Sequence, residues 1–151
     1  MAARCLAMKR AVIVTIRLIV AAVFVVAGVG KAQHPAAFIQ DIWNYRLVPE
    51  PWAYWIAALV PYLEIVAGLA LATGMQRRGA HVILLGLLVA FVVFLGSAWG
   101  RGLDIACGCF GAGAPGETDN LPWLMVRNLL LIGGVVVSAW AERSAPPARA
   151  T

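Results

Sequence analysis

The sequence predicts an all-α membrane protein in which four transmembrane helices form a bundle with both termini in the cytoplasm. Of its 151 residues, 62% are hydrophobic and 13% are charged, whereas soluble domains contain about 45–50% apolar and about 25% charged residues. A bilayer core of about 30 Å requires about 20 mostly apolar residues per helix, and the chain contains four such segments. This composition excludes an ordinary soluble enzyme and an intrinsically disordered chain. No basic stripe with interleaved aromatic residues indicates nucleic-acid binding.

The four expected spans belong to one membrane domain, residues 1–143, which is followed by a short Pro/Ala-rich tail, residues 144–151. We expect this tail to be disordered. Tryptophan side chains lie near the ends of the spans, as an aromatic belt at the two membrane surfaces requires. The sequence places the four helices at residues 11–30, 52–73, 80–99 and 121–140.

The first span follows Lys9 and Arg10 and contains one charged residue, Arg17. A basic start before an apolar run is also found in cleaved signal peptides. Because Arg17 interrupts this run, and because the run is long for a signal peptide, we expect a retained transmembrane helix.

The second span contains one charged residue, Glu64, three residues after Pro61, which we expect to kink the helix. At 1.5 Å per residue, Glu64 lies about 18 Å from the outer end of its span and Arg17 about 9 Å from the cytoplasmic end of the first span. These depths are similar, so we predict an intramembrane Arg17–Glu64 pair that fixes the bundle. A proton relay is the alternative role for the pair.

The third span has no formal charge apart from a possible one on His81, whereas the fourth contains Arg127 followed by Asn128. An arginine inside a membrane span is costly without a partner. Arg127 is therefore a candidate functional residue.

The distribution of Lys and Arg predicts the orientation of the spans. The two tails and the loop between the second and third spans contain more of these residues than the other two loops. The positive-inside rule then places both termini in the cytoplasm, and residues 31–51 and 100–120 on the outer side.

The second of these outer loops contains Cys107 and Cys109 on either side of Gly108. Disulfides form and persist outside the cytoplasm. A disulfide between residues i and i+2 requires a bent backbone, which Gly108 permits, and strained or exposed disulfides tend to be labile, catalytic or regulatory. We therefore predict a redox-active pair. Cys5, on the cytoplasmic side, is expected to be a free thiol.

Two other interpretations of the cysteine pair are open. The cysteines could be packing residues, although a pair flanking a glycine in a polar loop fits this poorly. They could also bind a metal: zinc would need His34 and acidic residues as further ligands, and Cu(I) would accept two thiolates with Met125 nearby. We expect no metal site.

Two cations are expected near the outer face, where they could act on the cysteine pair. Lys31 ends the first span, and Arg127 lies about two turns into the fourth. A cation beside a thiol stabilises the nucleophilic thiolate, so both are candidates for this role, with Asn128 as a hydrogen-bonding neighbour. Lys31 could equally be a residue whose ammonium snorkels to the membrane surface.

Taken together, these motifs resemble the methylamine utilisation protein MauE family, within the wider MauE/DoxX group of four-helix membrane proteins. The resemblance covers residues 10–140. One departure is visible: the family often has an acidic residue directly before the first cysteine, whereas here Asp104 precedes Ile105 and Ala106. The resembling residues are Gly28, Lys31, Pro35, Phe38, the segment YRLVP at 45–49, Pro61, Glu64, the segment CGCFG at 107–111, Trp123, Arg127 and Asn128.

The resemblance implies a multi-pass protein of the cell (inner) membrane that takes part in the maturation of methylamine dehydrogenase. That client has a small subunit with many disulfides and a quinone made from its own tryptophans. The resemblance also implies a thioredoxin-like extracytoplasmic partner of the MauD or TlpA type. The resemblance supports a general role in handling thiols at the outer membrane face more strongly than it supports methylamine dehydrogenase as the client.

Three hypotheses of function follow. The leading one is a membrane thiol–disulfide relay or maturation factor, a candidate oxidoreductase component. In it, Cys107 and Cys109 exchange disulfides with the partner, and a membrane quinone is a candidate electron carrier. The second is a small proton-coupled transporter that uses Glu64. The third is a non-catalytic scaffold subunit of a membrane redox complex. Loss of function on changing the cysteines alone separates the first hypothesis from the others.

Overall fold

A computed structural model describes residues 2–102 and 121–143, and these residues form five helices. Four of the helices contain stretches long and apolar enough to cross a membrane, which confirms the predicted all-α fold class with four spans. The side of the membrane on which the termini lie stays a prediction. The helices are α1 (Ala2–Gln33), α2 (Pro35–Asn44), α3 (Glu50–Thr73), α4 (Arg77–Gly100) and α5 (Leu121–Arg143). The candidate spans within them are Met8–Gln33, Glu50–Thr73, Arg78–Gly100 and Pro122–Arg143.

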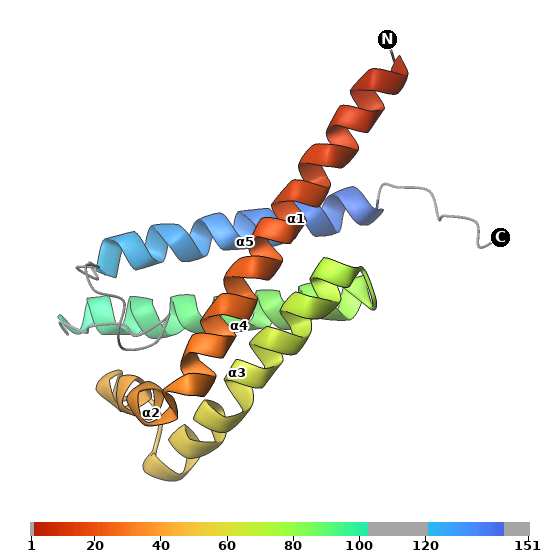
Figure 1. Ribbon diagram of the computed structural model, residues 1–151. Coiled ribbons are helices and arrows are strands. Elements are labelled where there is room, and N and C mark those ends of the chain that lie inside the picture. The colour runs from red at the N-terminus through yellow and green to blue at the C-terminus, as the bar shows by residue number, and fades with distance from the viewer. Residues whose placement is uncertain (1, 103–120, 144–151) are drawn as a thin grey trace.

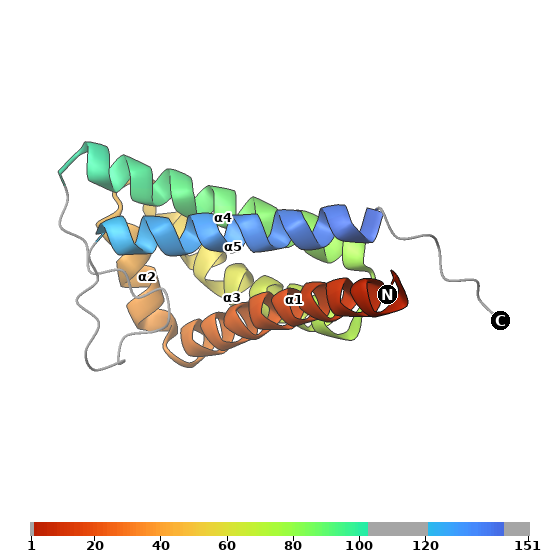
Figure 2. The same cartoon turned by 90° about the horizontal axis from the view of Figure 1, so that it is seen from above.

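The four long helices form two pairs, with the short helix α2 lying across one end. α1 packs most extensively against α3, and α4 runs beside α5 (Figure 1). In the view of Figure 2, α2 lies at one end of the bundle, and the start of α1 and the end of α5 lie at the other. We call these the α2 end and the termini end. α4 finishes and α5 begins at the α2 end.

Two glycines allow α1 and α3 to approach closely. A Cβ atom on Gly28 of α1 would lie 2.7 Å from the backbone oxygen of Pro61, and one on Gly68 of α3 would lie 2.9 Å from a methyl group of Val25. Small residues permit such approaches between helices in membranes, where packing rather than the hydrophobic effect holds helices together. The contact at Gly28 places the last turn of α1 beside the middle of α3.

Helix α2 lies within residues 31–51, the segment predicted to be an outer loop. Pro35 is suited to the first turn of a helix, where its missing N–H is not needed. Phe38 and Ile42 are four residues apart, so they share one face of α2, and both are buried against Ala53 and Ala57 of α3. The short helix therefore covers the α2 end with apolar side chains.

A turn joins α2 to α3 and is tied to the end of α4. The guanidinium of Arg101 donates a hydrogen bond to the carbonyl oxygen of Tyr45, and the Tyr45 ring packs edge-on against Phe94 at 5.5 Å. Arg46 has a left-handed backbone, with φ of 49°. These contacts fix α2 against both α3 and α4.

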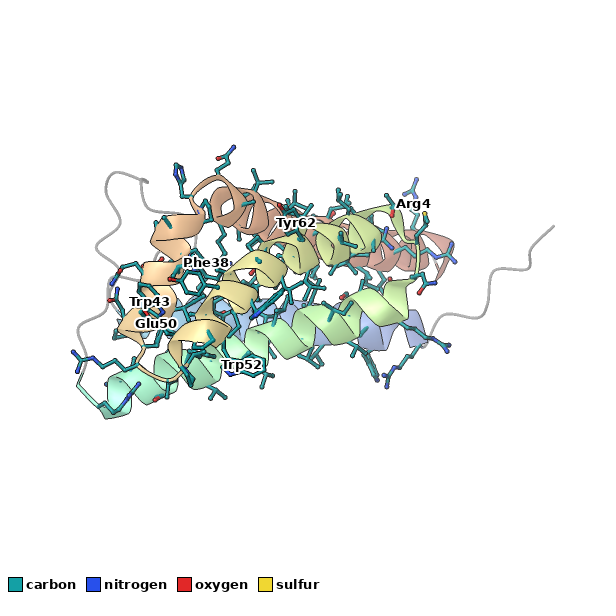
Figure 3. All side chains as sticks on the ribbon, turned by 90° about the horizontal axis from the view of Figure 1, so that it is seen from below. Arg4, Phe38, Trp43, Glu50, Trp52 and Tyr62 are labelled. Carbon is teal, nitrogen blue, oxygen red and sulfur yellow. The ribbon has the colours of Figure 1, made fainter. Side chains whose placement is uncertain are left out.

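Apolar side chains fill the interior of the bundle and also cover its outside. Trp52 and Tyr62 project outward from α3, whereas Phe38 lies at the α2 end and Arg4 at the termini end (Figure 3). Large apolar side chains that face outward are what a lipid environment requires. The inner cluster draws on α1, α3, α4 and α5 and includes Val20, Ala21, Phe24, Leu71, Leu84, Leu88 and Val135.

Candidate functional site

The most buried charged side chains that the structure describes are Lys31 and Glu64, and they form an ion pair. Lys31 lies in the last turn of α1, and its Nζ donates to Oε1 of Glu64 at 2.6 Å and to Oε2 at 2.8 Å. The Lys31 side chain is 2% exposed and the Glu64 side chain 1%. Because burial of a single charge in a membrane span is costly, each of the two residues makes the other tolerable.

Two aromatic rings complete the surroundings of the Lys31 ammonium. Its nitrogen lies 5.5 Å from the ring centre of Phe38 in α2 and 4.8 Å from that of Phe91 in α4, and such cation–π contacts stabilise a buried cation. Both rings also line an apolar pocket of about 80 Å³ between α2, α3 and α4. The rings thus stand between the ion pair and this apolar pocket.

On another side, the ion pair faces a small cavity that reaches α5. The cavity has a volume of about 30 Å³, and its polar lining is formed by Lys31, Glu64, Arg127 and Asn128. Asn128 is buried, and its Nδ2 donates to the backbone oxygen of Leu124 at 2.9 Å. The volume is sufficient for about two water molecules. With two cations and one carboxylate, the lining carries a net positive charge.

This arrangement differs from the predicted pairing of Arg17 with Glu64. Arg17 instead lies 3.4 Å from Glu142 of α5, and Glu64 pairs with Lys31. Helices α1 and α5 are each longer than the expected spans. Lys31 therefore lies inside α1, and Glu142 lies inside α5. The close contact at Gly28 then aligns Glu64 with the last turn of α1.

Comparison with known proteins identifies the family. The family described as "Methylamine utilisation protein MauE" matches residues 9–141. The chain belongs to the MauE family. It is 30% identical over 138 residues to the methylamine utilization protein MauE of Paracoccus denitrificans, covering 90% of this chain and 73% of that relative. It is 33% identical over 125 residues to the protein of the same name from Methylorubrum extorquens, covering 81% of this chain and 65% of that relative, just under two thirds of its length. No solved structure matches the chain.

MauE family membership and the four apolar helices together fit a multi-pass membrane protein. Of the predicted site residues, Lys31 and Arg127 line the same cavity, together with Asn128. Glu64 joins them, and Arg17 does not. The predicted role of Lys31 and Arg127 beside the cysteine pair stays a prediction.

The cysteine pair of this MauE family member, Cys107 and Cys109, lies outside the described residues, as does Asp104. Cys5 is within α1, but its side chain is not among those described. Of the residues considered as additional metal ligands, His34 is exposed at the start of α2, and Met125 packs beside Leu95 and Leu124. Within residues 2–102 and 121–143, no group of three or more His, Cys, Asp or Glu residues could hold a metal ion.

Sequence reasoning missed the contribution of Phe91, and it recognised Phe38 only as a residue resembling the family. Nothing in the apolar run of α4 distinguishes Phe91 from its neighbours. Phe38 had a usable signal, since it lies three residues after Pro35 and four before Ile42, which together indicate a short helix with one apolar face.

Proposed function

We propose that this MauE family protein serves methylamine utilisation as a membrane thiol–disulfide relay or maturation factor for an extracytoplasmic client. The names of the two relatives support the methylamine context. The observation that carries the proposal is the convergence of Lys31, Glu64 and Arg127 on one cavity with a net positive lining in a chain of this family.

The reaction we propose is exchange between the Cys107–Cys109 pair and a thioredoxin-like partner outside the cytoplasm. The thiolate of one cysteine attacks the partner's disulfide, forming a mixed disulfide and releasing one partner thiolate. The second cysteine then attacks the mixed disulfide, so that this chain ends with a disulfide and the partner with a dithiol. Two electrons and two protons pass to the partner, and the reverse sequence reduces this chain.

The position of α5 supports a role for Arg127 in this exchange. The segment that carries the cysteines joins the end of α4 to the start of α5, both of which lie at the α2 end. Arg127 is near the start of α5 and half-buried in the cavity lining. A guanidinium at this level would stabilise a thiolate on the adjoining segment and so raise its nucleophilicity.

The surroundings of Lys31 argue against Lys31 as the direct stabiliser of a thiolate. The ammonium of Lys31 already binds both oxygens of Glu64 and is enclosed by two rings. We therefore propose that Lys31 and Glu64 hold α1 and α3 in place at the site. The same pairing favours a structural role for Glu64 over the proton-coupled transport that the sequence left open.

The proposal is tested by replacing cysteines in a host that grows on methylamine and depends on this chain. We expect Cys107→Ser and Cys109→Ser each to abolish growth on methylamine and the formation of active methylamine dehydrogenase. Cys5→Ser is the matched control and should have no effect.

Two outcomes would contradict the relay. A transporter predicts that Glu64→Gln stops growth while the double cysteine variant still supports it. A scaffold predicts that Cys107→Ser retains full function, provided that immunoblotting shows equal amounts of protein in the membrane.

A further inference from the structure

At the termini end, α4 and α5 leave a wide groove between them. The groove has a volume of about 880 Å³ and is bounded by the first turns of α4, the last turns of α5 and the turn that joins α3 to α4. It lies at the opposite end of the bundle from α2 and from the last turn of α1, which carries Lys31. The relay proposed above makes no use of it.

The floor of the groove is apolar. Val82 and Leu85 of α4 and Val135 and Val136 of α5 line it. His81 also lines the groove, and its Nε2 lies 2.9 Å from Oγ of the buried Ser138, so these two polar groups bind each other across the helix pair. The valine and leucine side chains of the floor offer contacts for hydrocarbon.

The mouth of the groove is positively charged. Arg78 in the first turn of α4 and Arg143 at the end of α5 both line it and are exposed. Within the part of the chain that the structure describes, neither has an ionic partner. Glu142 also lines the groove, but Arg17 lies 3.4 Å from its carboxylate and offsets its charge. An apolar floor below cationic side chains is complementary to an anionic amphiphile.

The depth of the groove in the membrane identifies the class of amphiphile. Its floor belongs to the candidate spans Arg78–Gly100 and Pro122–Arg143, and its charged mouth lies at their ends. Trp140, which is 71% exposed, also lines the groove, as expected at a membrane surface. Phospholipid headgroups occupy this level of the bilayer, and their acyl chains occupy the level of the floor.

We propose that the α4–α5 groove is a binding site for an anionic phospholipid. Arg78 and Arg143 bind its phosphate, as arginine does through its fork of N–H donors. One or both acyl chains lie over the valine and leucine floor and fill the space between the ends of α4 and α5. A phospholipid with net negative charge is favoured over a zwitterionic one because basic residues at a membrane surface attract anionic lipid.

The test uses the full chain, stripped of lipid in detergent and then returned to nanodiscs of equal parts phosphatidylglycerol and phosphatidylcholine. Lipid retained by the protein on re-extraction is counted by mass spectrometry. We expect the wild-type protein to retain more phosphatidylglycerol than phosphatidylcholine. Each arginine should contribute about fivefold to the retention of phosphatidylglycerol, so the double variant Arg78→Gln with Arg143→Gln should reduce this retention by more than tenfold. The matched control, Lys9→Gln with Arg10→Gln, removes the same charge from exposed residues of α1 outside the groove and should change retention less than twofold.

A second pair of variants tests the apolar floor without changing any charge. Gly79 lines the groove and Gly86 does not, and a Cβ atom added at either position would meet no atom closer than 3.9 Å, apart from the nearby backbone of its own helix. Gly79→Leu should fill part of the groove and displace the lipid, whereas Gly86→Leu, on the same helix, should leave retention unchanged. Circular dichroism and gel filtration establish that all variants are folded.

Several outcomes would overturn the proposal. Equal retention of the two lipids would mean that only a non-specific lipid annulus surrounds this end of the bundle. An equal loss in both double variants would mean that bulk charge and not the groove attracts the lipid. Displacement of the lipid by inorganic phosphate at millimolar concentration would reduce the groove to an ion site.

Discussion

A lysine whose side chain is almost completely buried in a membrane span requires compensation on every side. Lys31 receives it from the two oxygens of Glu64 and from the rings of Phe38 and Phe91. Removal of one member of a buried ion pair leaves the other charge uncompensated, which is more damaging than removal of both. The pair is thus a constraint that holds α1, α3 and α4 in one arrangement.

This constraint gives the first stability prediction. Lys31→Met and Glu64→Gln, each alone, should lower the free energy of unfolding by about 3–5 kcal/mol. The double variant should recover much of this loss, because no unpaired charge is left. Reversible unfolding in mixed micelles, analysed as a double-mutant cycle, measures the coupling. Additive losses would show that the two side chains act independently.

A second prediction at the residue scale concerns the effect of Arg127 on the reactivity of the Cys107–Cys109 thiols. If its guanidinium stabilises a thiolate, Arg127→Gln should slow alkylation of the reduced Cys107–Cys109 pair at neutral pH by about tenfold, while Arg127→Lys keeps most of the rate. Rates are measured by mass spectrometry of iodoacetamide adducts. Alkylation of Cys5 in the same molecule is the internal control, and an equal slowing there would point to a general change in the protein.

The sequence identified most of the charged residues of the site but not their pairing. Lys31, Glu64 and Arg127 are recognisable because a charge inside or beside an apolar run is rare. The predicted partner of Glu64 was wrong because equal depths assume that the outer ends of the first two spans lie at one level. Instead the first turns of α3 pack on α2, and the last turn of α1 lies beside the middle of α3. Lys31, about 21 Å along α1 from Arg17, therefore reaches Glu64. The correct register is set by the contact of Gly28 with the backbone of Pro61, a packing detail that hydropathy does not contain.

At the scale of the helices, the interface of α1 and α3 depends on the absence of a side chain at Gly28. Gly28→Ala would place a methyl group 2.7 Å from the backbone oxygen of Pro61, which cannot rotate away. We expect a loss of about 1–3 kcal/mol in the free energy of unfolding, the usual effect of overpacking. Gly133→Ala in α5, where an added Cβ would meet no atom within 4 Å apart from the nearby backbone of its own helix, is the matched control and should be neutral or slightly stabilising. Equal effects of the two substitutions would contradict the close helix contact.

Helix α2 shows what hydropathy alone misses. The four spans were predictable because each is a long apolar run, and a search for such runs passes over a helix of 10 residues. Its role depends on tertiary contacts: Phe38 and Ile42 are buried only because α3 presents the small side chains of Ala53 and Ala57 to them.

At the scale of the whole molecule, the distribution of positive charge predicts the orientation in the membrane. Reporter fusions test it: green fluorescent protein joined after Arg143 should fluoresce, and alkaline phosphatase joined there should be inactive. Fusions after Gly102 should show the opposite pattern. If phosphatase were active after Arg143, the cysteine segment would face the cytoplasm, where disulfides are rare. This result would contradict the proposed relay.

The central claim is that Cys107 and Cys109 exchange disulfides with a thioredoxin-like partner, and trapping the mixed disulfide tests it most directly. In a Cys109→Ala variant the second step is blocked, so an adduct between Cys107 and the partner should accumulate in cells quenched with acid and alkylated. A reductant should cleave the adduct into its two proteins. The double variant Cys107→Ala with Cys109→Ala should form no adduct. If no adduct forms in Cys109→Ala or in Cys107→Ala, and the wild-type pair stays in one oxidation state during growth on methylamine, the claim is wrong.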